Sequence, residues 1–169
     1  MPAPAERGPR QGTTALLALG SNLAPREVNL DLGTVALLEA GAALLASSPR
    51  WHTHALGTPP QEDFLNQLLL LRDLRSGPQW LALARAAEGR AGRRRSVAHG
   101  PRSLDVDIIL IERQSWETEE LTVPHPGLLT RPYLLRGAAE LVPDWSHPVL
   151  GISIRELARQ LLTGSWALR

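Results

Sequence analysis

One eight-residue segment, Leu104-Asp-Val-Asp-Ile-Ile-Leu-Ile111, constrains the fold more than any other part of the sequence. Side chains alternate between the two faces of a strand, so Asp105 and Asp107 share one face, about 6.5–7 Å apart. Their apolar neighbours, beginning with Leu104, share the opposite face. A strand with an apolar face must bury it against other elements, which indicates a sheet packed on helices.

Apolar periodicity and turn residues predict the other elements. A strand over residues 14–19 ends at Gly20-Ser21-Asn22, and Val28, Leu32, Val35 and Leu38 then recur at helical spacing between Pro25 and Gly41. A strand is predicted over 44–54, with Pro49 permitted only at an edge or a bulge, followed by a loop over 57–63 and a strand over 64–72. The remaining predictions are a helix from Ser76, a basic loop over 88–100, a helix over 132–141 and a last helix behind the capping box Ser153–Glu156. The order β-α-β-β-α-β with additional C-terminal helices is that of an α+β, ferredoxin-like fold.

The bulk properties predict one domain over residues 14–169 behind a flexible tail, residues 1–13. The chain has 169 residues, 43% of them hydrophobic, and no internal repeat or linker. No apolar run reaches the roughly 20 residues that span a bilayer, and the first residues lack the apolar middle of a signal peptide. A net charge of +1 gives the molecule no overall positive electrostatic potential that would attract nucleic acid. We therefore expect a cytoplasmic protein, without membrane or nucleic-acid partners, and, since there are no heptads, a monomer.

Asp105 and Asp107 are the candidate metal ligands. The sequence has no cysteine, so His, Asp and Glu remain for any metal. Two carboxylates on one face repel each other, and a hard divalent ion such as Mg²⁺ offsets that repulsion. The alternatives are a solvated strand end and a structural pairing with Arg102.

Arginine supplies every one of the 18 basic side chains. Arg93 and Arg95 come from a glycine-containing stretch, and Arg102 directly precedes the aspartates. Forked guanidinium donors match phosphate oxygens, whereas a Walker motif is excluded because the sequence has no lysine. The alternative is a solvated basic loop, or one that contacts RNA.

Phe64 and Asn66 stand two apart on a predicted strand and therefore share a face. An aromatic ring beside a carboxamide suits a flat heterocycle with amide-like edges; the alternative is a core ring with Asn66 bonded to backbone. His52 and His54 also share a face, but without a third ligand we predict no metal site there.

Several blocks together resemble the hydroxymethyl-dihydropterin pyrophosphokinase family. They are residues 18–23 (ALGSNL), 53–57 (THALG), 64–66 (FLN), 92–93, 100–107 (GPRSLDVD), 121–125 (LTVPH), 131–133, 140–144 (ELVPD) and 147–148. Each block alone is weak, but the order and spacing of the set are specific.

The resemblance implies an ATP-dependent pyrophosphokinase of folate biosynthesis. Such an enzyme transfers pyrophosphate from ATP to the hydroxymethyl group of 6-hydroxymethyl-7,8-dihydropterin, giving AMP and the pterin diphosphate. By resemblance, two Mg ions are held by Asp105 and Asp107, and Arg93 and Arg102 act in catalysis with both aspartates. The pterin is bound by Thr53, Leu56, Phe64, Asn66 and Tyr133. ATP is bound by Glu88, Arg93, Arg95, Arg102, Ile108, Thr122, His125 and Arg131.

The chain departs from the family pattern at several positions. His99 stands where a Trp is usual, Glu120 where a basic residue is common, and Gly137-Ala138 and His54-Ala55 replace other usual residues. These departures concern loop geometry and affinity, and the roles of Arg94 and Arg95 stay open.

Two other functions fit part of this pattern. A metal-dependent nuclease would share the aspartates and arginines but gives no reason for Phe64, Asn66 and Tyr133. An RNA-binding ferredoxin-like module needs exposed aromatic side chains and a basic face, whereas this chain has acids on the strand.

Overall fold

The computed structural model describes residues 12–55, 60–92 and 100–163. Five strands form one sheet: β1 (Thr13–Ser21), β2 (Ala43–Ser47), β3 (Trp51–Thr53), β4 (Phe64–Asp73) and β5 (Asp105–Ile111). The strand order is β2-β4-β1-β5, β3 also pairs with β4, and all pairs are antiparallel. Most of the predicted tail, residues 1–11, lies outside the described residues.

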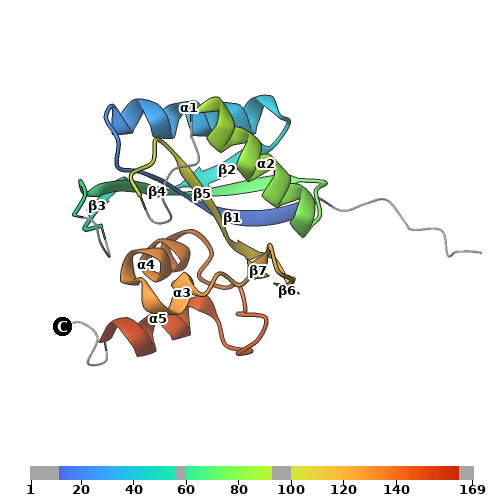
Figure 1. Ribbon diagram of the computed structural model, residues 1–169. Coiled ribbons are helices and arrows are strands. Elements are labelled where there is room, and N and C mark those ends of the chain that lie inside the picture. Colours follow the sequence, from blue (N-terminus) through green and yellow to red (C-terminus); the bar gives the residue numbers. More distant parts are fainter. Residues whose placement is uncertain (1–11, 56–59, 93–99, 164–169) are drawn as a thin grey trace, which may run out of the picture.

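Helices cover both faces of the sheet (Figure 1). On one side lie α1 (Arg26–Glu39) and α2 (Gly77–Arg90); on the other lie α3 (Gly127–Thr130), α4 (Pro132–Leu141) and α5 (Ile154–Thr163). Strand β1 serves both layers, because Leu17 and Leu19 pack with α1 and α2 while Leu16 and Ala18 pack with α3–α5. The fold is therefore the predicted α+β, ferredoxin-like one with additional C-terminal helices.

Helix α1 turns an unexpected face to the sheet. Val28, Leu32 and Val35, which reveal the helix in the sequence, are 46–49% exposed. The buried face instead contains Leu30, Gly33 and Leu37. A Cβ atom at Gly33 would lie 2.6 Å from Leu104 Cδ2, so the glycine permits α1 to approach the strand that carries the aspartates.

Two other segments differ from their predictions. The strand expected over 44–54 is two edge strands, β2 and β3, separated around Pro49, which has no N–H to donate to a ladder. The basic loop expected from residue 88 begins later, because α2 continues to Arg90, and residues 93–99 lie outside the described part.

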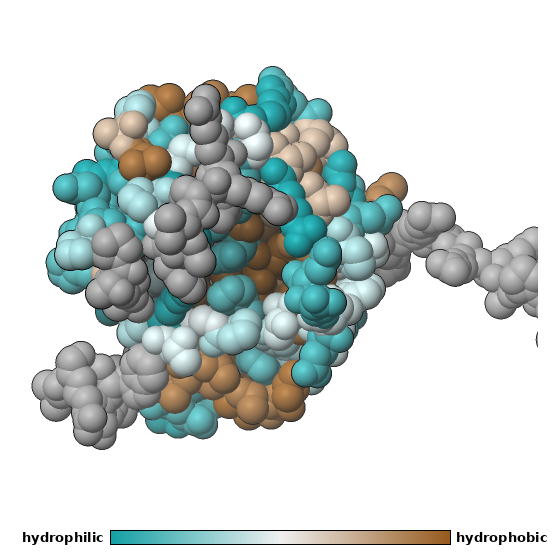
Figure 2. Space-filling model, viewed as in Figure 1, coloured by the Kyte–Doolittle hydropathy of each residue, from teal (hydrophilic) through white to brown (hydrophobic). Residues whose placement is uncertain are grey.

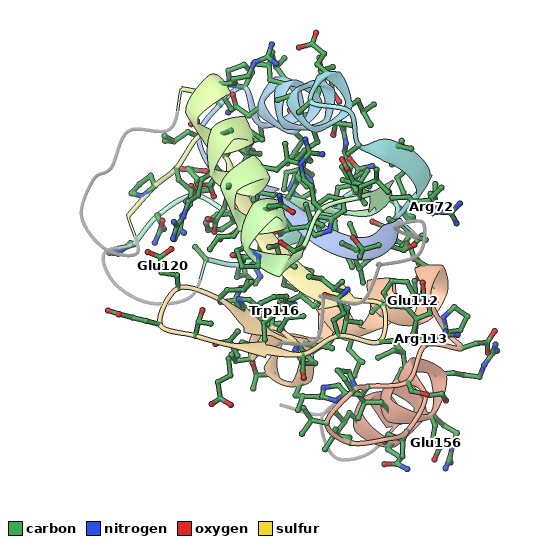
Figure 3. The ribbon with its side chains drawn as sticks, turned by 90° about the vertical axis from the view of Figure 1, so that its right-hand side faces the viewer. Arg72, Glu112, Arg113, Trp116, Glu120 and Glu156 are labelled. Carbon is green, nitrogen blue, oxygen red and sulfur yellow. The ribbon has the colours of Figure 1, made fainter. Side chains whose placement is uncertain are left out.

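An unpredicted hairpin, β6 (Trp116–Glu117) and β7 (Thr122–Val123), lies beside the start of α2 (Figure 3). A Cβ atom at Gly77 would lie 2.5 Å from Trp116 Cε2, so Trp116 packs directly on the backbone of that helix. This contact fixes one end of the hairpin against α2. In the part of the chain that the structure describes, no helix has the length and apolarity to cross a membrane.

Candidate active site

Strand register brings the predicted site residues to one end of the sheet. Gly20 in β1 pairs with Asn66 on one side and Asp105 on the other. Residues directly opposite across strands share a face. The row from Asn66 through Gly20 to Asp105 therefore lies on the face of the sheet that carries α3–α5.

Gly20 forms the floor between the two candidate binding regions. A Cβ atom there would lie 2.9 Å from Asn66 Oδ1 and 3.5 Å from Phe64 Cδ1. Asn66 Nδ2 donates to Thr53 Oγ1 at 2.8 Å, which orients the carboxamide. The sequence interpretation treated Gly20 as the end of a strand and missed this role, although a glycine within a strand often marks a close approach.

Asn22 is a second residue that the sequence interpretation did not assign to the site. It is 2% exposed. Its Oδ1 accepts the backbone N–H of Arg102 at 2.8 Å, and its Nδ2 donates to Gln61 Oε1 at 2.8 Å. Asn22 thus connects the segment that carries Arg102 to the segment that precedes Phe64.

Asp105 forms an ion pair with Arg102, whose Nη1 lies 2.8 Å from Asp105 Oδ2. The structural pairing with Arg102, the alternative to metal binding, is therefore present, although it does not account for Asp107. The Arg102 guanidinium carbon also lies 5.7 Å from the centre of the Phe64 ring, within the range of a cation–π contact. Arg102 therefore lies between the aromatic and acidic parts of the site.

Burial raises the pKa of Asp107 above its usual 3.8, and the neighbouring Asp105 carboxylate raises it further. The charges of His125, Arg131 and Arg102 oppose this shift. A second cation close to the pair would favour the ionised form of Asp107.

His125 and Tyr133 approach the aspartates from the segment after β7. His125 Nδ1 accepts the backbone N–H of Gly127 at 2.9 Å, so a neutral ring carries its proton on Nε2, 4.0 Å from Asp107 Oδ2. Burial raises the pKa of Tyr133, against the opposing charge and hydrogen bond of Arg131. Tyr133 therefore contributes an uncharged phenol at neutral pH.

A cavity of about 260 Å³ extends from Asp107 between β5 and the hairpin. Ile108, Thr122 and His125, all predicted on the ATP side, line it together with Leu81, Val106, Glu119, Glu120, Leu121 and Pro126. Figure 2 shows a hollow in this face of the molecule, with hydrophobic residues at its floor and hydrophilic ones around it. Glu88 and Arg131 are not in its lining, and Glu88 Oε1 accepts the backbone N–H of Val106 at 2.9 Å.

Some predicted residues cannot be placed in this geometry. Leu56, Arg93 and Arg95, with Arg94 and His99, lie outside the described residues.

His54 Nδ1 lies 3.0 Å from Asp63 Oδ1. Over residues 12–55, 60–92 and 100–163, no three His, Asp or Glu side chains are grouped so that they could hold a metal by themselves. A metal at the aspartate pair would therefore need further oxygen ligands from substrate or water.

The model of one protein family, 7,8-dihydro-6-hydroxymethylpterin-pyrophosphokinase (HPPK), matches residues 16–143. The chain belongs to this family. The 2-amino-4-hydroxy-6-hydroxymethyldihydropteridine pyrophosphokinase of Synechocystis is 37% identical over 161 residues, 94% of this chain and 82% of the relative. That of Bacillus subtilis is 38% identical over 129 residues, 75% of this chain and 77% of the relative.

HPPK enzymes transfer a pyrophosphoryl group in folate biosynthesis, and this chain is such a pyrophosphokinase. Crystal structures agree in fold: Plasmodium falciparum HPPK-DHPS wild type has a TM-score of 0.65 at 12% sequence identity. The match covers 89% of this chain but only 45% of that longer one. At this identity the likeness establishes the ferredoxin-like fold alone.

Proposed function

We propose that this HPPK transfers the pyrophosphoryl group of ATP to the hydroxymethyl group of 6-hydroxymethyl-7,8-dihydropterin. The pterin lies over Gly20, between Phe64 and Tyr133, with its amide-like edge on Asn66. ATP lies in the cavity lined by Ile108, Thr122 and His125. Arg131 and Glu88 act from its border. The acidic pair lies where these two regions meet.

The aspartate pair fits Mg²⁺ on its chemistry. Mg²⁺ prefers oxygen and is bound by one or two carboxylates, with phosphate oxygens and water completing the octahedron. Asp105 and Asp107 offer such carboxylates, and a divalent ion there would offset the burial and the mutual repulsion that raise the pKa of Asp107. Two Mg²⁺ ions, when bound, would neutralise the triphosphate and make its β-phosphorus more electrophilic.

The reaction forms one bond and breaks one. The pterin hydroxyl oxygen attacks the β-phosphorus, the bond between that phosphorus and the α–β bridging oxygen breaks, and AMP departs with that oxygen. The hydroxyl proton passes to Asp107 or to solvent. Arg102, held by its ion pair and by Asn22, faces the transferred group. Arg93 and Arg95 would add charge from the neighbouring stretch.

The observation that carries the proposal is the row Asn66–Gly20–Asp105, which has a carboxamide and a carboxylate on one face of the sheet with a glycine between them. The test is a quench assay of AMP formation from ATP, Mg²⁺ and the hydroxymethyl-dihydropterin. We expect AMP and pterin diphosphate in equal amounts, and loss of both on adding a chelator. ADP as the product, or turnover without the pterin, would refute the proposal. A gel shift with RNA, which we expect to be negative, tests the RNA-binding alternative.

We further propose that residues 14–169 act as one domain, that the protein is a monomer and that it works in the cytoplasm. One sheet joins both apolar layers, which supports the first point. Sedimentation velocity and cell fractionation test the other two, and a stable dimer or a membrane-bound fraction would contradict them.

A further inference from the structure

A larger cavity, about 330 Å³, lies on the other side of the β6–β7 hairpin. Its apolar wall includes Trp116, Pro124, Leu129 and Val149. Small-molecule sites typically have volumes of about 300–1,000 Å³ with mostly apolar walls and a few polar groups. The cavity therefore has the size and the lining of a site for a small ligand.

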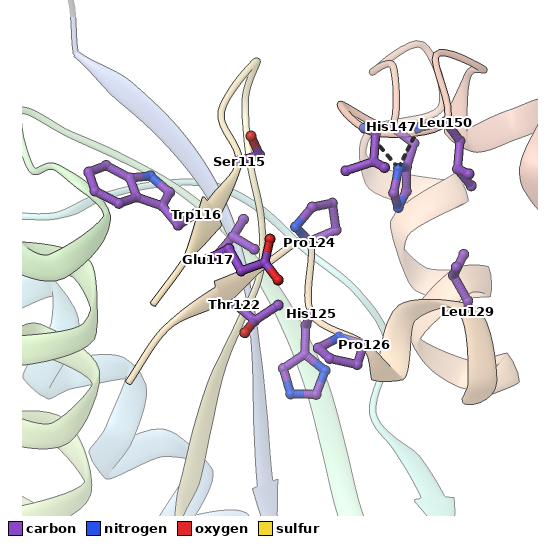
Figure 4. Close-up of a pocket in the computed structure, with 12 residues that line it drawn as sticks. Ser115, Trp116, Glu117, Thr122, Pro124, His125, Pro126, Leu129, His147 and Leu150 are labelled. Atoms are coloured by element: carbon purple, nitrogen blue, oxygen red, sulfur yellow. Dashed lines mark hydrogen bonds between the residues drawn. The ribbon is translucent and has the colours of Figure 1, made fainter. Parts of the chain in front are cut away.

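His147 is one of the polar groups that line this cavity (Figure 4). Only 4% of the residue is exposed. Its Nδ1 accepts the backbone N–H groups of Val149 and Leu150 at 3.3 and 3.2 Å. In a neutral ring the proton is then on Nε2, for which no hydrogen-bond partner exists among the described residues. Burial lowers the pKa of His147, so the ring stays neutral and Nε2–H remains a donor.

Glu117 lines the opposite side of the cavity, on the hairpin (Figure 4). Its carboxylate can accept a hydrogen bond but repels an anion. A ligand that accepts from His147 must therefore carry no negative charge. An aromatic amide, whose carbonyl oxygen is an uncharged acceptor joined to a flat apolar ring, has this combination of groups.

Three residues, Thr122, His125 and Pro126, line both this cavity and the one beside Asp107. We infer that the His147 cavity is a second binding site, for an uncharged amide with a flat apolar body, and that its occupant changes nucleotide binding through this shared wall. The proposed transfer reaction does not use His147. The coupling rests on the proposed nucleotide site, whereas ligand binding in the His147 cavity does not depend on it.

The probe is benzamide, compared with toluene, which lacks both polar groups, and with benzoate, which is an anion. Saturation-transfer NMR on the full chain measures their binding. We expect benzamide to bind most tightly, and His147→Asn to weaken it about 5- to 10-fold, the value of one hydrogen bond. Asparagine places an oxygen near the position of Nδ1 and so keeps the loop contacts. His52→Asn, on the distant β3, is the matched control.

A second variant does not depend on the buried histidine. Val149 is 72% exposed, so Val149→Trp should fold normally while filling the cavity and abolishing benzamide binding. Equal binding of toluene and benzamide, no saturable binding, or full affinity in both variants would overturn the site. Titration of an unreactive ATP analogue with Mg²⁺, with and without benzamide, tests the coupling; an unchanged nucleotide affinity would overturn that part. Neither measurement depends on turnover, so a failure of the second site can be distinguished from a failure of the proposed transfer reaction.

Discussion

Replacing Gly20 with alanine places a methyl group where the floor of the site has no room. The new Cβ would lie 2.9 Å from Asn66 Oδ1, closer than such contacts occur. The carboxamide must move, and it cannot do so without disturbing its 2.8 Å hydrogen bond to Thr53. We therefore expect Gly20→Ala to displace the side chain that reads the pterin edge.

The magnitude follows from the hydrogen bonds at risk. Each misaligned bond from Asn66 to the pterin costs about 0.5–1.5 kcal/mol of binding free energy, so two such bonds cost about 1–3 kcal/mol, which is about 5- to 150-fold in pterin affinity. Losing the Thr53 bond costs a similar amount of stability in the free and the bound protein alike, so it does not weaken binding. Alanine in a strand returns about 0.5–1 kcal/mol relative to glycine, so the free energy of unfolding should change little.

Fluorescence titration of the hydroxymethyl-dihydropterin, with Mg²⁺ and an unreactive ATP analogue, measures the effect. Gly89→Ala is the matched control, because a Cβ at Gly89 meets nothing within 4 Å and should leave pterin affinity unchanged. A double-mutant cycle with Asn66→Ala decides the route. If the two losses of affinity add fully, the effect does not pass through Asn66 and the reasoning is refuted.

Three further outcomes are expected. Asp107→Asn should abolish turnover and stabilisation by Mg²⁺, but it should raise the melting temperature at neutral pH. Because the pKa of Asp107 is raised in the folded state, the folded state binds more protons than the unfolded state above about pH 3.8, and the free energy of unfolding falls as the carboxyl ionises. Removing the ionisable carboxyl therefore removes this cost at neutral pH. A lower melting temperature would contradict this. Arg93→Ala should slow single-turnover transfer while pterin affinity is kept, and the reverse pattern would remove Arg93 from catalysis. For His147, a lowered pKa means that the unfolded state binds more protons below 6.5, so the free energy of unfolding should fall as pH drops through that value, and His147→Asn should lose this slope.

The local features of the fold were predictable because they depend on neighbouring residues. Side chains alternate between the two faces of a strand, which places Asp105 and Asp107 on one face of β5. At the predicted start of α2, Gln79 Oε1 accepts the backbone N–H of Ser76 at 2.8 Å. The hairpin β6–β7 was missed because its two-residue strands contain no apolar run. The apolar residues on the exposed face of α1 repeat at helical spacing, which predicts the helix. The same spacing does not show which face of α1 is buried, and here glycine and alanine on the other face permit a closer approach to the sheet.

The site was predictable as residue types but not as an arrangement. The sequence indicates a carboxylate pair, arginines and a ring beside an amide. It does not give the register that sets Asn66 and Asp105 on either side of Gly20, because register depends on pairing between segments far apart in the chain. The part played by Asn22 was hidden for the same reason, since its partners are Arg102 and Gln61.

The hydrogen bond between Glu88 and Val106 has a consequence for how the protein behaves among other copies. Strand β5 ends the sheet order, and the open side of such a strand is where another molecule can add a strand of its own. The Glu88 carboxylate already occupies the Val106 donor. An incoming strand would meet a negative charge and a missing donor there, which protects this edge against fibre-like growth.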